Sequence, residues 1–156
     1  MLALVLKAIH VFASMLFLGL GIGSVFYKLR AYRSGDPAAL AFCDREIVLA
    51  DWLFTVPSGV LLPATGLWMA HLYRLPLTTP WILVGVGGWA LAGLTWLPAA
   101  FLQIRMRGMS ARALERGEPL PPAYRSAHRA WMTLGLPSFT AAMFVLWAMI
   151  AKAAAF

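Results

Sequence analysis

Three histidines are the residues of this chain best suited to chemistry, and each lies in or beside a long apolar segment. They are His10, His71 and His128. A histidine ring can bind a metal through a neutral nitrogen or carry a proton near neutral pH. An ionisable side chain at the centre of a bilayer costs about 2.5 kcal/mol or more, so such residues are candidates for function by default. We therefore take these histidines and their polar neighbours as candidates for ligand binding or proton transfer.

The first candidate set lies toward one end of the apolar segments. It consists of His10, Ser14, Met69 and His71, with Lys7, Thr65 and Met149 at a similar depth. Two histidines on facing helices would hold a b-type haem, and histidine with methionine suits either haem or copper. At about 100° per residue, however, His71 lies about 160° round its helix from the stripe that holds Asp51 and Thr65, so only a kink at Pro63 would bring it inward. In the alternative interpretation, His10 donates a hydrogen bond to a neighbouring helix and His71 lies in the headgroup zone.

The second candidate set lies near the opposite end of the apolar segments. It contains Lys28, Asp51 and His128, with Ser24 nearby. A carboxylate near lipid needs a partner to remain ionised, so we expect an ion pair between Lys28 and Asp51. A proton relay or a quinone site is the alternative. Most of the membrane thickness separates His10 from His128, so these two histidines cannot bind the same metal.

Four charge-free segments must position these residues. They are 8–27, 52–73, 75–104 and 130–151. The chain is 62% hydrophobic and 12% charged, against about 25% charged residues in soluble domains. A helix needs about 20 apolar residues to cross a bilayer. We therefore predict an all-α fold: an integral membrane four-helix up-and-down bundle, one domain over 1–156 with spans at about 3–28, 48–73, 79–104 and 129–152.

The basic residues predict how the bundle is oriented. Ten of the thirteen lie on or beside the first and third connections, near 28–46 and 105–129. Cytoplasmic connections carry an excess of lysine and arginine, so we place both connections in the cytoplasm and both termini on the opposite side, in the periplasm or at the cell exterior. Because the net charge of +7 is concentrated beside the spans, we expect it to meet lipid phosphates and not nucleic acid.

The remaining motifs do not point to a soluble enzyme. The sequence "GLGIGS" lies within the first span, where its glycines favour close helix packing over a dinucleotide-binding loop. Gly19 and Gly23 form a small-xxx-small pair that permits contact with another membrane subunit or with a second copy in a homo-oligomer. The single cysteine, Cys43, excludes an internal disulfide, and its role is open. Whether the protein is an enzyme is also open.

Three stretches carry a resemblance to known families. They are "LKAIHVFASMLFLGLGIG", "TWLPAAFLQIRMR" and "AHRAWMTLGLPSFTAAMFVLWAMIAK". Together they resemble a family of predicted bacterial integral membrane proteins, DUF2269, over nearly the whole chain. The start "LKAIH" is more distantly similar to the HemJ-type protoporphyrinogen oxidases and the CopD copper-handling membrane proteins. The HemJ resemblance implies that His10 binds b-type haem. The chain lacks the later lysine and histidine arrangement of the oxidase, which argues against porphyrinogen oxidation.

These observations lead to one preferred function and two alternatives. We expect a small inner-membrane protein that binds a b-type haem or another redox ligand through His10, for electron transfer or cofactor handling. The first alternative is a non-catalytic accessory or assembly subunit whose glycine faces and basic connections contact a larger membrane complex. The second is copper handling through His10, Met69 and His71.

Overall fold

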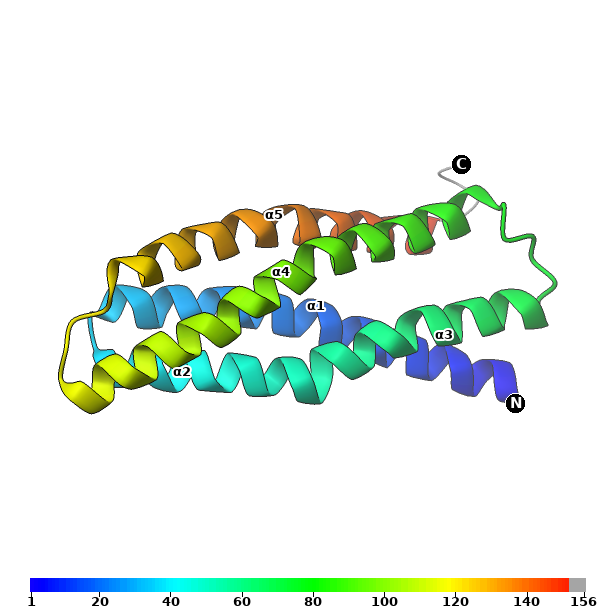
Figure 1. The fold of residues 1–156 in the computed structure, drawn as a ribbon. Helices are drawn as coiled ribbons and strands as arrows, with labels where there is room; N and C mark the ends of the chain where they lie inside the picture. Colours follow the sequence, from blue (N-terminus) through cyan, green and yellow to red (C-terminus); the bar gives the residue numbers. More distant parts are fainter. Residues whose placement is uncertain (152–156) are drawn as a thin grey trace.

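The computed structural model describes residues 1–151 and shows a bundle of long helices (Figure 1). The elements are α1 (Leu2–Ser34), α2 (Pro37–Ala50), the π-helix η1 (Asp51–Thr55), α3 (Val56–Leu72), α4 (Pro80–Arg116) and α5 (Pro122–Ala151). Because α2, η1 and α3 follow one another without a break, they form one continuous helical rod. With α1, α4 and α5, the bundle therefore has four rods. All four rods are long and apolar enough to cross a membrane. The predicted all-α membrane bundle is therefore confirmed.

The helices are longer than the predicted spans. The 37 residues of α4 correspond to about 55 Å of helix, against a hydrocarbon layer of about 30 Å. The predicted connection 28–46 is almost entirely helical and shrinks to Gly35 and Asp36. Gly35 ends α1 with a left-handed φ of 71°, and the Asp36 side chain accepts a hydrogen bond from the Ala38 N–H at 2.8 Å. With Pro37 as the first residue of α2, these groups turn the chain within two residues.

The two basic connections lie at the same end of the bundle, as predicted. Residues 35–36 and 117–121 are at one end, and Met1, the connection 73–79 and the end of α5 are at the other (Figure 1). We call the first the basic end and the second the terminal end.

The buried core lies toward the basic end. Its cluster contains Leu40, Ala99, Met106, Tyr124, Ala127 and Trp131. Toward the terminal end the rods pack mainly in two pairs, α1 with α3 and α4 with α5, and bulky apolar side chains such as Phe12, Val60 and Leu94 are exposed. Such side chains meet no penalty in lipid. The fold thus gathers its buried ionisable side chains, Lys28, Asp44, Asp51 and His128, toward the basic end.

A proline within α3 leaves a backbone carbonyl free for a contact between the α1–α3 pair and the α4–α5 pair. Pro63 has no N–H to donate to the Gly59 carbonyl one turn earlier. The indole Nε1 of Trp89 on α4 donates to that carbonyl at 2.8 Å. A backbone group freed by proline is therefore satisfied by a neighbouring helix, as a membrane interior requires.

Two glycines on α4 allow α5 to approach closely, and they are expected to respond differently to alanine. A Cβ atom at Gly85 would lie 2.2 Å from the Met149 methyl, and one at Gly88 would lie 2.2 Å from Cγ2 of Val145. The flexible Met149 side chain can move away, whereas a β-branched valine in a helix has one strongly preferred rotamer. We therefore expect Gly88→Ala to lower the free energy of unfolding by about 1–3 kcal/mol. Gly85→Ala is expected to change it little.

Unfolding in detergent with increasing dodecyl sulfate, followed by circular dichroism, measures both effects. Gly88→Ala combined with Val145→Ala should recover part of the loss, because the clash is removed. Equal losses for Gly85→Ala and Gly88→Ala would contradict this account of the interface.

Candidate functional site

A buried ion pair joins the helices at the basic end. Lys28 of α1 pairs with Asp44 of α2, and both residues are 2% exposed. The other carboxylate oxygen of Asp44 accepts hydrogen bonds from the Ser110 hydroxyl of α4 at 2.7 Å and from the Tyr124 hydroxyl of α5 at 2.9 Å. We call these four residues the Lys28–Asp44 network. It connects all four rods through a single carboxylate.

The predicted partner of Lys28 was wrong. The expected pair with Asp51 assumed a long connection, whereas α1 and α2 are joined by only two residues. In a tight antiparallel turn, the residues at similar distances from the turn lie side by side. Lys28 is seven residues before Gly35 and Asp44 is eight after Asp36, so these two residues meet. The sequence signal that was missed is Gly-Asp-Pro at 35–37, which ends one helix and begins another.

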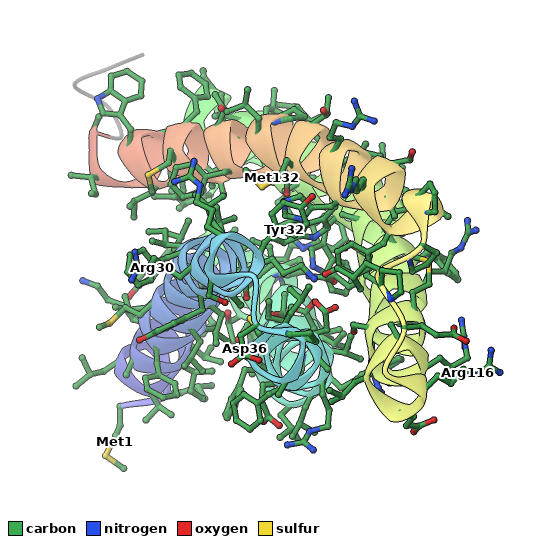
Figure 2. The ribbon with its side chains drawn as sticks, turned by 90° about the vertical axis from the view of Figure 1, so that its left-hand side faces the viewer. Met1, Arg30, Tyr32, Asp36, Arg116 and Met132 are labelled. Atoms are coloured by element: carbon green, nitrogen blue, oxygen red, sulfur yellow. The ribbon has the colours of Figure 1, made fainter. Side chains whose placement is uncertain are left out.

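Aromatic rings surround this network. The Tyr32 ring stacks on the His128 ring, with centroids 4.4 Å apart. The Trp131 ring also stacks on the His128 ring, with centroids 6.1 Å apart. The ammonium group of Lys28 is 5.2 Å from the centre of the Tyr124 ring, a cation–π contact. Viewed from the basic end, Tyr32 points into the space between the helices while Arg30 points away (Figure 2). Within residues 1–151, the buried Nδ1 atom of His128 has no hydrogen-bond partner.

Asp51 lies deeper, in the π-helix η1. One carboxylate oxygen accepts a hydrogen bond from the Thr55 hydroxyl at 2.8 Å, and the buried Gln103 side chain of α4 also faces the group. The second oxygen, Oδ2, is buried without a hydrogen-bond partner among the described residues. Single-turn π-helices occur frequently at functional sites. Of the predicted set, the structure thus places Lys28 in the network and His128 beside it on Tyr32, whereas Asp51 lies apart, next to Thr55 and Gln103.

In the terminal half, His10 contacts α3. Its Nδ1 atom lies 2.9 Å from the Thr65 hydroxyl oxygen, and that hydroxyl donates its proton to the Leu61 carbonyl at 2.6 Å. With its proton given to the Leu61 carbonyl, the hydroxyl oxygen is free to accept from His10, and this assigns the tautomer with the proton on Nδ1. In a neutral ring, this leaves the lone pair on Nε2, which is the nitrogen that can bind a metal.

The surroundings fix the position of the His10 ring. The Ser14 hydroxyl donates a hydrogen bond to the His10 backbone carbonyl at 2.8 Å. Its proton is therefore used within α1 and is not offered to a ligand. A Cβ atom at Gly66 would lie 3.2 Å from Cε1 of His10, so the ring packs against the backbone of α3. Helix α3 thereby supplies both a hydrogen-bond acceptor and the space for the imidazole.

His71 and Met69, the other members of the predicted outer set, form no hydrogen bond with the His10 ring within the described part of the chain. His71, near the end of α3, is exposed, and Met69 is partly buried. The proline at position 63 does not turn His71 into the bundle. Within residues 1–151, no group of three or more His, Cys, Asp or Glu side chains is placed to hold a metal ion. His10 and Thr65 are therefore the part of the predicted outer site that the fold assembles, while Ser14 bonds to the backbone of its own helix.

An open apolar groove of about 350 Å³ runs between α1 and the η1–α3 segment. It is lined by Ala8, Ile9, Phe12, Ala13, Leu16, Leu53, Phe54, Pro57, Ser58 and Leu61. Ser58 is the one polar side chain in this lining. The groove's other lining side chains are apolar.

Comparison with protein families gives a match over residues 4–153 to the family described as "Predicted integral membrane protein (DUF2269)". The comparison with curated proteins found no match, and the comparison with solved structures found none either. The more distant similarity to HemJ and CopD proteins is not confirmed and stays a resemblance. Since the match covers nearly the whole sequence and the fold has four apolar helical rods, the chain belongs to the DUF2269 family of predicted integral membrane proteins.

Proposed function

We propose that this protein binds a b-type haem or another redox ligand through His10, for electron transfer or cofactor handling. The observation that carries the proposal is the hydrogen bond between Nδ1 of His10 and the Thr65 hydroxyl. A histidine that binds a metal almost always donates its other ring N–H to a second group, which fixes the tautomer and the orientation of the ring. His10 has this arrangement on a helix within the membrane.

The residues present fit one protein ligand to a haem iron. Nε2 of His10 would be that ligand, and Thr65 would orient the ring. His71 is exposed, so it supports neither a second haem ligand nor the copper site with His10 and Met69. A bound haem would supply one-electron chemistry. The chain itself would hold the iron ligand and surround it with apolar helices that limit the access of water.

The location within the cell is part of the same proposal. We place the basic end in the cytoplasm of a bacterium and the terminal end outside its inner membrane, because arginine-rich connections are retained on the cytoplasmic side. His10 then lies in the outer half of the bilayer. A ligand there would exchange electrons or cofactor with partners at the outer surface.

The optical spectrum of the purified protein tests the proposal. In detergent, with haemin added stepwise under reducing conditions, we expect saturable binding and the sharp Soret and α bands of a b-type haem. A preparation that stays colourless, gives no saturable change and co-purifies with other membrane proteins would support the accessory role instead. A colourless preparation with stoichiometric copper would support copper handling.

One structural feature favours the accessory role as the second candidate. A Cβ atom added at Gly19 or Gly23, which share one face of α1, would meet nothing within 4 Å. The glycine face of α1 is therefore open to the surroundings of the bundle, although small residues in membrane helices commonly mark close helix contacts. Another membrane subunit or a second copy of this chain would fit that face.

A further inference from the structure

A shallow groove of about 320 Å³ lies on α4 at the basic end, away from His10 and from the Lys28–Asp44 network. It is lined by Ile104, Arg105, Gly108, Met109 and Arg112. These residues share one flank of the helix. The buried residues of the same stretch, Met106, Ser110 and Ala113, contact the bundle from another flank. The groove therefore opens outward, toward lipid and water.

The groove lies at the level where the apolar segment ends. Residues 75–104 carry no charge, and Arg105 is the first charged residue after them. Hydropathy thus places Ile104 beside hydrocarbon and Arg105 at the headgroups. Basic residues just outside a span meet lipid phosphates there.

Both arginines line the groove, and the position of the Arg112 guanidinium along the helix is known. Their backbones are two helical turns apart, or about 10.5 Å along the axis. The Arg112 guanidinium folds back over Gly108, where a Cβ atom would lie 3.2 Å from Nη1. This brings its charge toward Arg105 and the membrane. Gly108 is thus the residue that makes room for the guanidinium.

No carboxylate neutralises these arginines among residues 1–151. The ion pairs there are Lys28 with Asp44 and Arg45 with Glu46. Two guanidinium groups without an acidic partner favour an anionic ligand, and the planar guanidinium matches the geometry of phosphate.

We propose that this groove binds one anionic phospholipid of the adjoining leaflet. Its phosphate lies between Arg105 and Arg112, and the first part of an acyl chain runs along Ile104 into the hydrocarbon layer. A net negative headgroup complements the two arginines, whereas the cation of a choline headgroup opposes them. The site is independent of the ligand at His10.

Native mass spectrometry of the full chain in detergent tests this inference, with phosphatidylglycerol and phosphatidylcholine as probes. We expect the wild type to retain phosphatidylglycerol preferentially. Arg105→Gln with Arg112→Gln should weaken its binding by about 30-fold, at the strength typical of two basic residues near a membrane surface. The matched control, Arg107→Gln with Arg129→Gln, removes the same charge from two exposed residues at a similar depth and should change binding much less.

A second variant separates shape from charge. Gly108→Leu keeps both arginines but fills the space under the Arg112 guanidinium, so it should also weaken phosphatidylglycerol binding. Circular dichroism checks that each variant is folded. Equal losses in the control pair, equal retention of phosphatidylcholine, or displacement of the lipid by millimolar inorganic phosphate would each overturn the proposal.

Discussion

Asp44→Ala is expected to lower the free energy of unfolding by about 3–5 kcal/mol, the cost of leaving one member of a buried ion pair without its partner. Lys28 is 2% exposed, so its ammonium group would lose its counter-charge without gaining water. The hydroxyl groups of Ser110 and Tyr124 would lose their acceptor at the same time. The one carboxylate that contacts all four rods at the basic end would be lost.

Labelling of the single cysteine measures how easily the basic end opens. Cys43 is buried on α2, so a maleimide dye should label it only when the basic end opens. We expect labelling of Asp44→Ala at a markedly lower temperature than labelling of the wild type, with circular dichroism as a second probe. Lys28→Met combined with Asp44→Leu should recover much of the loss, because no isolated charge remains.

The exposed pair of Arg45 and Glu46 provides the matched control. Its side chains are 60% and 40% exposed, and surface pairs contribute about 0–1 kcal/mol. Glu46→Ala should therefore shift the labelling temperature only slightly. If Asp44→Ala had no greater effect than Glu46→Ala, the network would not be what holds the basic end together.

Replacing His10 by alanine is expected to abolish saturable haem binding, because it removes the ligand nitrogen. Thr65→Val should weaken binding by about 10–100-fold, the usual effect of removing a group that orients a ligand. The Nδ1–H would lose its acceptor, while Nε2 would still be present. The measurement is a haemin titration followed by the Soret band.

His71→Ala is the control for this series, because His71 is exposed near the end of the same helix that carries Thr65. It should leave the titration unchanged. Added imidazole should restore part of the Soret band to His10→Ala, which a merely misfolded variant would not show. A His10→Ala protein with the wild-type spectrum would remove His10 from the proposed function.

The apolar rods and their alternating up-and-down order follow from the sequence alone. The apolar segment 80–104 must be helical and in lipid, because hydropathy is a sum over neighbouring residues and needs no knowledge of packing. The placement of both basic connections at one end follows from four spans in succession. The line that carries His10 and Ser14 also follows from helical periodicity, although it does not reveal which helix His10 meets.

Only the tertiary structure decided the partners. Lys28 meets Asp44 and not Asp51, because the turn at Gly35 and Asp36 is two residues long and sets the register of α1 against α2. Trp89 reaches Gly59 because Pro63 leaves a carbonyl free on the facing helix. Each of these contacts depends on how two rods are placed side by side. That placement arises from turn geometry and close packing across the bundle, which a local pattern of residue types does not contain.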